Sequence, residues 1–230
     1  MEMQHFRSTQ IGSTLFAFLL LLTACGDRMP IRGGEEAARA ATEAAEAGAA
    51  DLELSNMGHA RGSAMANVVV VEFSDFGCPY CARFALETLP EIDEEFIETG
   101  QVRWQYVPFV MGIFPNGEEA ARASECAADQ NAFWPMHDLI YERQREWRGT
   151  TAAEPLFIGY AEQLQLDVQE FSACYRENRP GSRIASNNAA AARLGIQATP
   201  SFLVNGRAVQ GALPLEQFRM LLQWAGAPGS

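Results

Sequence analysis

Two cysteines separated by two residues, Cys78 and Cys81, are the residues of this chain best suited to covalent chemistry. They follow an apolar run, residues 67–74, and open a segment of helical apolar periodicity that reaches about residue 98. The start of a helix offers unpaired N–H groups and a partial positive charge, which favour a thiolate over a thiol. The pattern therefore predicts a dithiol for thiol–disulfide exchange, with Cys78 exposed and reactive and Cys81 one turn inside as the resolving thiol.

A Cys-x-x-Cys pair can also be half of a zinc site. Zinc would need a second pair of ligands at short spacing, and the sequence contains none. Redox chemistry is therefore favoured, and it needs neither a metal nor a bound cofactor because the dithiol itself carries the electrons. Trp134, His137 and Trp147 are expected to be packing residues, since no cluster with metal-ligand spacing surrounds the histidine.

The elements that must hold the pair are predicted to run in the order β-α-β, then a helical block, then β-β-α. Strands are expected at 51–55, 67–74 and 101–108, with a loop through Gly58 and Gly62 and a helix over 79–98. Helices 117–130, 133–147, 154–165, 167–178 and 181–194 form the block. A hairpin, 201–204 and 207–210, turns at Asn205-Gly206 as type I′, and helix 213–224 follows.

Two of these helices carry further expectations. The inward face of the helix over 79–98 is predicted to be Phe84, Leu86, Leu89, Ile92 and Phe96. Pro90 is expected to kink that helix. Asn116-Gly117, followed by two glutamates, predicts a turn and helix-capping chemistry at the start of the next helix.

The amino terminus has the pattern of an export signal. Residues 15–22 are apolar but too short to span a bilayer comfortably, and they end in Leu22-Thr23-Ala24-Cys25, which is similar to a bacterial lipoprotein box. We expect a signal over 1–24 and a lipid on Cys25, with an ordinary secretory signal as the alternative. Either signal places the protein at the periplasmic or extracytoplasmic face of the cell envelope, where disulfides persist.

Residues 25–57 are low in complexity and rich in alanine and glutamate. They contain no apolar stripe that could dock a helix, so a tether to the membrane is expected rather than a packed helix. The net charge is −12, and it is the same without residues 1–24. Because phosphate binding needs a basic face, a nucleic-acid partner is not expected.

Three features together resemble the DsbA-like thiol:disulfide oxidoreductases of the thioredoxin superfamily. They are the stretch Glu72 to Cys81 (EFSDFGCPYC), the stretch Ala198 to Phe202 (ATPSF) before a hairpin, and the helical block between them. The resemblance covers about residues 58–226. It implies an α/β, thioredoxin-like fold with a helical insertion subdomain at about 112–194.

The resemblance also implies a role for each motif residue. Cys78 is the expected nucleophile and Cys81 the resolving thiol, while Pro79 and Tyr80 order the first helical turn. Glu72 stands in an apolar strand, so its pKa should be raised, and the family uses an acid there to exchange the proton of the second cysteine. A glutamate at the strand edge that faces solvent is the alternative.

The same resemblance places Thr199 and Pro200 at the substrate side. In thioredoxin folds this proline follows a cis peptide bond and faces the cysteine pair. The backbone of Thr199 is then free to pair with an extended substrate segment.

The remaining cysteines, Cys126 and Cys174, fall in two helices of the insertion. An oxidising compartment and an even remainder favour a structural disulfide between them. Two buried free thiols, or a second redox pair, are the alternatives.

Three functions remain open from the sequence. The first is a monomeric enzyme that donates disulfides to thiol-containing exported proteins and is reoxidised by a quinone-linked membrane oxidase, a partner that the resemblance implies. The second is a reductase or isomerase, since Tyr80 and Thr199 also occur in isomerase-type relatives. Residues 26–57 are too short for the dimerising domain of those relatives, which weakens this reading. The third is a tethered, non-catalytic binding module, although binding alone would not require both thiols.

Overall fold

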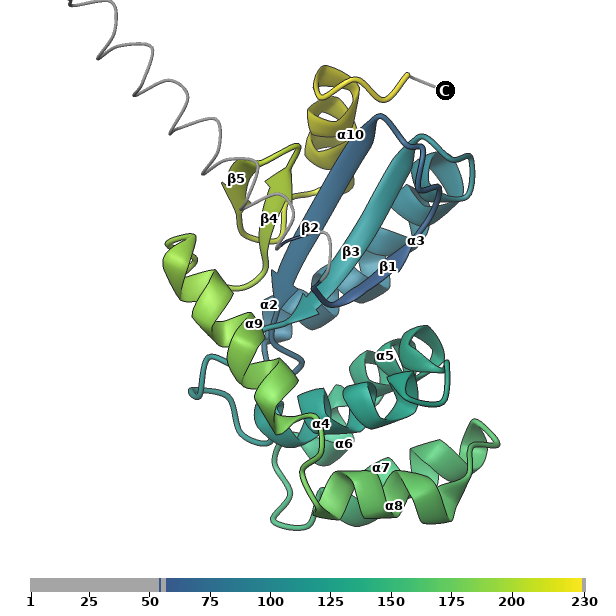
Figure 1. Cartoon of the computed structure of the whole chain (residues 1–230). Coiled ribbons are helices and arrows are strands. Elements are labelled where there is room, and N and C mark those ends of the chain that lie inside the picture. The colour runs from purple at the N-terminus through teal and green to yellow at the C-terminus, as the bar shows by residue number, and fades with distance from the viewer. Residues whose placement is uncertain (1–53, 55–56, 229–230) are drawn as a thin grey trace, which may run out of the picture. The chain divides into compact units, whose positions relative to one another are not determined.

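Residue 54 and residues 57–228 are described by the structure, a computed structural model (Figure 1). The chain divides into two units, Met1–Ala45 and Glu46–Ser230, and every described residue belongs to the second unit. The expected signal, Cys25 and nearly all of the expected tether therefore lie outside the described residues. The described part of the chain contains no helix that is long and apolar enough to cross a membrane.

A five-stranded mixed sheet in the order β1-β3-β2-β4-β5 forms the centre of the fold. The strands are β1 (His59–Arg61), β2 (Val68–Ser74), β3 (Val102–Pro108), β4 (Ser201–Val204) and β5 (Arg207–Gln210). β2 and β3 pair in parallel, and all other neighbours are antiparallel. A parallel pair needs a crossover element, which is the helical segment that carries the two cysteines.

The first strand does not lie where the sequence predicted it. Leu54, inside the expected strand 51–55, lies in a helical turn, and β1 occupies part of the expected loop. A Cβ on Gly58 would lie 2.0 Å from the Tyr106 carbonyl oxygen, and one on Gly62 would lie 2.5 Å from that of Val102. The two glycines therefore mark a close approach of β1 to β3, which the sequence pattern could not distinguish from a loop.

The crossover segment is continuous from residue 79 to residue 97 but changes its winding. It consists of α2 (Pro79–Arg83), a π-helical segment (Phe84–Thr88), α3 (Leu89–Ile92) and a second π-helical segment (Asp93–Ile97). Pro90 follows the first π-helical segment, at the point where a missing N–H prevents regular α-helical bonding. Leu86 does not belong to the inward face, because it is 44% exposed. A residue two positions from the buried Phe84 points to another side of the helix.

Apolar side chains cover both faces of the sheet. On one face, the crossover segment and α10 (Leu215–Trp224) pack against the strands around Phe84, Trp104 and Phe202. On the other face, residues from the end of α9 (Gly181–Arg193) and beyond pack against β2 and β4. The hairpin between β4 and β5 has the expected turn, since Asn205 and Gly206 both have positive φ, 46° and 80°.

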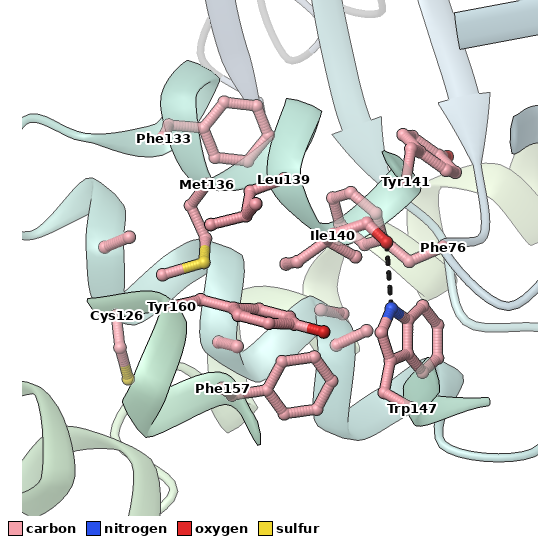
Figure 2. Close-up of a cluster of buried hydrophobic side chains, with 14 of the residues drawn as sticks. Phe76, Cys126, Phe133, Met136, Leu139, Ile140, Tyr141, Trp147, Phe157 and Tyr160 are labelled. Atoms are coloured by element: carbon pink, nitrogen blue, oxygen red, sulfur yellow. Dashed lines mark hydrogen bonds between the residues drawn. The ribbon is translucent and has the colours of Figure 1, made fainter. Parts of the chain in front are cut away.

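The helical insertion lies beyond the ends at which β2 and β3 stop (Figure 1). Before α9 it contains α4 (Gly117–Ala128), α5 (Phe133–Glu142), α6 (Gln144–Trp147), α7 (Glu154–Gln163) and α8 (Val168–Arg176). These helices surround their own buried cluster, in which Trp147 donates from Nε1 to the Ile140 carbonyl oxygen at 2.8 Å (Figure 2). Phe76 belongs to this cluster, so the turn before Cys78 is anchored in the core of the insertion.

Asn116 is the N-cap residue of α4, and Glu118 and Glu119 form the expected acidic first turn, but the Asn116 side chain makes no capping hydrogen bond. Its backbone is left-handed, with φ 57°, and its Nδ2 donates to the carbonyl oxygens of Trp147 and Thr150 at 2.7 and 2.8 Å. The asparagine therefore ties the segment after α6 to the start of α4. The group that lies against Gly117 at this helix start is the carboxylate of Asp75.

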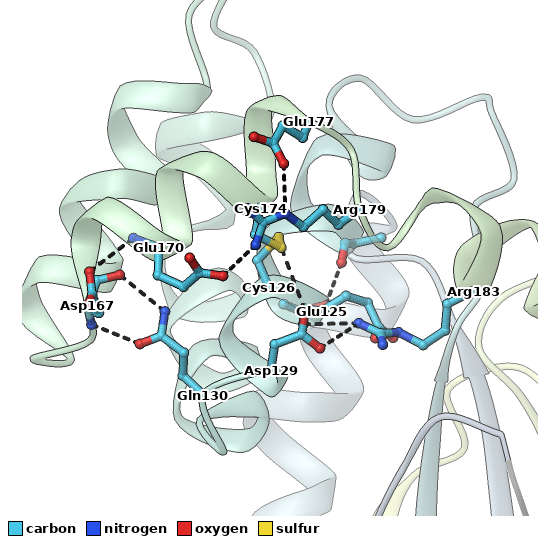
Figure 3. Close-up of a disulfide and its surroundings, with 12 residues drawn as sticks. Glu125, Cys126, Asp129, Gln130, Asp167, Glu170, Cys174, Glu177, Arg179 and Arg183 are labelled. Atoms are coloured by element: carbon cyan, nitrogen blue, oxygen red, sulfur yellow. Dashed lines mark hydrogen bonds and ion pairs between the residues drawn. A yellow bond between two sulfur atoms is a disulfide. The ribbon is translucent and has the colours of Figure 1, made fainter.

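Cys126 of α4 and Cys174 of α8 are joined by a disulfide with a Cα–Cα distance of 5.8 Å. Figure 3 shows the bond among charged side chains at the junction of α4, α8 and α9. There Arg183 contacts the buried carboxylate of Glu125 at 2.5 Å and that of Asp129 at 3.1 Å. The insertion is thus held by a covalent link as well as by its apolar cluster.

Candidate active site

Cys78 occupies the N-cap position of α2, with φ −77° and ψ 124°. Pro79 is the first helical residue, where its missing N–H costs nothing because that N–H has no partner within a helix. The Cys78 carbonyl oxygen accepts the Ala82 N–H at 3.1 Å, which is the first intrahelical bond. The thiol therefore stands beside the unpaired N–H groups of the first turn, as the sequence predicted.

The two thiols are free and have opposite pKa shifts. A hydrogen bond from Cys81, followed by hydrogen bonds from Thr199 and from the backbone N–H groups of the first turn, lowers the pKa of Cys78 to about 6 despite desolvation. Burial, and next the interaction with Cys78, raise the pKa of Cys81 well above its ordinary value. At neutral pH this combination gives a thiolate at Cys78 and a thiol at Cys81.

Cys78 is not exposed, contrary to expectation. Only 1% of its surface is accessible. The Thr199 segment is one of its neighbours, since Cys78 Sγ is 3.5 Å from the Thr199 carbonyl oxygen. A partner sulfur can therefore reach Cys78 only after this segment or a neighbouring one moves.

The peptide bond between Thr199 and Pro200 is cis. It lies immediately before β4 and beside the cysteine pair, in the position that the resemblance implied. Tyr80 is 60% exposed next to the thiols, and the guanidinium of Arg83 lies 5.2 Å from its ring centre. Cys78, Cys81, Pro79, Tyr80 and the Thr199–Pro200 pair are thus brought together at one end of the sheet.

Glu72 is completely buried in the middle of the sheet, so the alternative of a solvent-facing glutamate at the strand edge is wrong. It lies opposite Tyr106 of β3 and Phe202 of β4. Trp104 Nε1 donates to its Oε2 at 3.0 Å, and Ser74 Oγ donates to its Oε1 at 2.5 Å. Burial raises the pKa of Glu72 to about 7, against the lowering effect of these two hydrogen bonds. The carboxyl group can therefore take up or release a proton near neutral pH.

Ser74 connects this carboxyl group to the resolving cysteine. Its side chain lowers the pKa of the Cys81 thiol, and its hydroxyl donates to Glu72. A hydroxyl can accept one proton while it donates another. Ser74 thus lies next to both Glu72 and Cys81 in the chain of interactions, a place that the sequence pattern did not suggest.

Two further residues near the thiols, Asp75 and Gln144, were missed at the level of sequence. Asp75 accepts the N–H of Gly77 and of Met111, each at 2.8 Å, with its two carboxylate oxygens. Gln144 of α6 donates from Nε2 to the carbonyl oxygens of Phe76 and Cys78, at 2.6 and 3.0 Å. These contacts come from the insertion and from the loop after β3, so only the folded chain places them beside Cys78.

His137 is a buried packing residue, as expected. Its ring lies among those of Phe76, Tyr106 and Tyr141, and its Nδ1 is 2.7 Å from Asp138 Oδ1. Burial lowers the pKa of His137, which keeps the imidazole neutral. Within Leu54 and residues 57–228, no group of three or more His, Cys, Asp or Glu side chains is arranged to hold a metal ion.

Residues 54–223 match the thioredoxin family. The chain belongs to this family, and its helical insertion gives it a DsbA-like fold. Among solved structures, BdbD from Bacillus subtilis superimposes with a TM-score of 0.66 over 72% of this chain and 91% of that one, at 23% identity. The predicted fold class is confirmed.

Two curated relatives illustrate how the matched region occurs in other proteins. The Na(+)/H(+) antiporter NhaA 3 of Salinispora tropica is 38% identical over 160 residues, which are 69% of this chain but 23% of that protein. The probable disulfide bond formation protein D of Bacillus anthracis is 30% identical over 145 residues, 61% of this chain and 66% of the relative. This chain therefore spans less than a quarter of the antiporter's length.

Proposed function

We propose that the protein is an extracytoplasmic thiol:disulfide oxidoreductase that donates the Cys78–Cys81 disulfide to exported proteins. The observation that carries the proposal is the lowered pKa of Cys78, about 6, beside a resolving thiol whose pKa is raised. A stabilised thiolate favours the reduced enzyme over its disulfide, and this makes the couple a strong oxidant. The DsbA-like fold and the relative named for disulfide bond formation support the same reading.

The exchange would start when a client thiolate attacks Cys78 Sγ of the oxidised enzyme. The Cys78–Cys81 bond breaks, Cys81 leaves with the electron pair, and a proton from Glu72 reaches it through Ser74. A second client thiolate then attacks the client sulfur of the mixed disulfide and releases Cys78 as a thiolate. The client loses two electrons, and the enzyme gains them.

Clients would bind as extended segments against the backbone of Thr199, beside the cis bond to Pro200. The reduced dithiol must then pass its electrons on, and a quinone-linked membrane oxidase is the class of partner that we propose. We also propose that residues 1–24 direct export and that Cys25 carries a lipid, with residues 25–57 as a tether and 58–226 as the catalytic domain. Mass spectrometry of the mature amino terminus tests the anchor.

The reduction potential of the Cys78–Cys81 couple tests the function. The purified protein is equilibrated against glutathione buffers, and the trapped thiols of each cysteine are counted by mass spectrometry, which separates this pair from Cys126–Cys174. A disulfide donor should have a potential near −120 mV, about that of the most oxidising thioredoxin-fold proteins. A potential of about −230 to −270 mV would overturn the proposal and assign a reductase.

A further inference from the structure

Asp75 is a second buried carboxylate near the reactive thiol, three residues before Cys78. Its carbonyl oxygen accepts the Cys78 N–H at 2.9 Å, and its Oδ1 accepts the Gly77 N–H at 2.8 Å. Its Oδ2 accepts the N–H of Met111, in the loop after β3, at 2.8 Å. Asp75 therefore holds the turn that carries Cys78 and, at the same time, the loop that leads from β3 into the insertion.

The space around this carboxylate is formed by glycine. A Cβ on Gly117, the first residue of α4, would lie 2.5 Å from Asp75 Oδ1. A Cβ on Gly77 would lie 3.3 Å from the same oxygen and 2.5 Å from the Cβ of Phe114. Side chains at these positions would displace the carboxylate or the loop. The start of α4 also favours a negative charge at this point.

Asp75, Met111, Thr199 and Cys78 form a closed chain of contacts, which we call the circuit. Met111, whose N–H Asp75 holds, places its Sδ 3.4 Å from the Thr199 hydroxyl oxygen. The Thr199 carbonyl oxygen is 3.5 Å from Cys78 Sγ. We propose that Asp75 is a positioning residue for exchange at Cys78: through Met111 it fixes the Thr199 segment against the reactive thiol. This inference rests on the proposed exchange at Cys78.

Asp75 is also coupled to the thiol by charge. Burial raises its pKa to about 6, the hydrogen bonds from Met111 and Gly77 oppose this, and the Cys78 thiolate raises the pKa further. The other charged or titratable groups that interact with it are Arg148, which lowers its pKa, and Tyr106, whose own pKa is raised partly by Asp75. When the disulfide is reduced, a negative charge appears at Cys78. Asp75 should then take up a proton in the pH range near 6, and a charged Asp75 should in turn disfavour the thiolate.

The test compares the full-length wild-type protein with Asp75→Asn, which keeps the side-chain volume and removes the charge. The thiolate absorbance of Cys78 and the equilibrium constant with glutathione are measured from about pH 5 to about pH 8, the range in which both groups titrate. We expect a lower Cys78 pKa and an equilibrium shifted about tenfold toward the reduced enzyme, the effect of a pKa shift of about one unit. The pH dependence of the equilibrium constant should also lose the contribution that comes from protonation of Asp75.

Two matched variants separate charge from positioning. Glu118→Gln removes a carboxylate from the same helix start, outside the circuit, and should leave all three readouts unchanged. Met111→Leu keeps the N–H that Asp75 binds but removes the sulfur beside Thr199, so the KM for a client peptide should rise while the pH dependence stays as in the wild type. An Asp75→Asn protein with the wild-type thiol pKa and pH dependence would overturn the inference.

If Asp75→Asn does not fold, the wild-type protein decides the question alone. The carboxyl carbon of Asp75 is titrated by NMR in the oxidised and the reduced form, and its pKa should be higher in the reduced form. Equal values in the two forms would overturn the coupling. A failure of the proposed function would appear in the reduction potential of the wild-type Cys78–Cys81 couple. A failure of this inference would appear in the comparison of Asp75→Asn with the wild type.

Discussion

Cys78 and Cys81 stand in one helical turn, yet their thiols have opposite protonation. Cys78 receives hydrogen bonds from Cys81 and from the backbone at the helix start, whereas Cys81 is enclosed by apolar neighbours one turn further along. The buried carboxyl group of Glu72, with a pKa of about 7, supplies a proton store for the second thiol. Burial sets the protonation of Glu72 and Cys81, whereas hydrogen bonds set that of Cys78 against the effect of burial.

Replacing Glu72 by Gln should flatten the pH dependence of stability of the reduced protein. The pKa of Glu72 is raised from 4.5 to about 7 in the folded state. The folded protein therefore keeps a proton that the unfolded chain releases in this window, and stability falls as the pH rises through it. Glu72 alone should account for a loss of about 3 kcal/mol by about pH 8, and Glu72→Gln should lack this contribution while it keeps those of Asp75 and Cys78.

Urea unfolding at about pH 4 and about pH 8.5, on either side of this window, measures the effect. Glu94→Gln, at an exposed position of the crossover segment, is the matched control and should behave as the wild type does. A second readout is the rate at which Cys81 attacks a mixed disulfide at Cys78, which should fall in Glu72→Gln. If the free energies of unfolding of Glu72→Gln and the wild type differ by the same amount at both pH values, Glu72 does not change its protonation in this pH range.

The residues that share a local motif could be predicted from the sequence. Cys78, Cys81 and Glu72 follow one another along a strand and the helix after it, so their relative positions are set by regular geometry. Asp75 was overlooked, although it lies in the same motif, because its importance depends on the N–H of Met111 in a distant loop. The burial of Cys78 was missed for the same reason, since its neighbour Thr199 is 121 residues away along the chain.

Among the elements, the order of strands and helices agrees with the prediction and the differences occur where backbones approach closely. Residues 116–194 were recognised as several helices, because each has its own apolar periodicity and its own end signals. β1 was missed because three residues are too few for an alternating pattern and two glycines flank them. The π-helical turns of the crossover segment have no sequence signal that periodicity alone could detect.

The disulfide between α4 and α8 should stabilise the protein without affecting the active pair. It closes a segment with a sequence separation of 48, for which restriction of the unfolded chain predicts about 4 kcal/mol. The combination Cys126→Ala and Cys174→Ala should therefore lower Tm by about 10 °C. The glutathione equilibrium of Cys78–Cys81 should remain as in the wild type.

Thermal unfolding followed by circular dichroism measures the loss. The matched control is the combination Cys78→Ser and Cys81→Ser, which removes the other pair of thiols and should keep the Cys126–Cys174 bond. A double alanine variant as stable as the wild type would show that the apolar cluster and the Arg183 ion pairs alone hold the insertion. The alternative of two free thiols at these positions is at odds with the bonded sulfurs.

In the described unit as a whole, the active turn is held from two sides. The sheet and the crossover segment hold Cys78 from one side, and Gln144 of the insertion holds the carbonyl oxygens of Phe76 and Cys78 from the other. The insertion is therefore part of the architecture of the site. This could not be derived from the sequence, because the pattern gives the helices but not the face that each of them turns toward the sheet.

The proposed lipid anchor leads to a prediction for the whole protein. Expressed in a bacterium that processes lipoproteins, the mature chain should begin at Cys25 and carry acyl groups, and it should fractionate with membranes. Cys25→Ala is the control and should abolish the acylation. An unmodified amino terminus further along the wild-type chain would exclude the anchor and leave an ordinary secretory signal.

The sulfur of Cys78 is charged and yet almost inaccessible to a reaction partner. With a pKa of about 6, the sulfur is ionised most of the time at neutral pH, yet only 1% of the residue is accessible. We expect a small oxidant or a stray thiol to react only when the segments around Cys78 move apart. We propose that an extended protein segment that pairs with Thr199 drives this movement itself. The enzyme would thus discriminate between reaction partners by the rate at which each gains access to Cys78, even when their sulfur atoms are equally reactive.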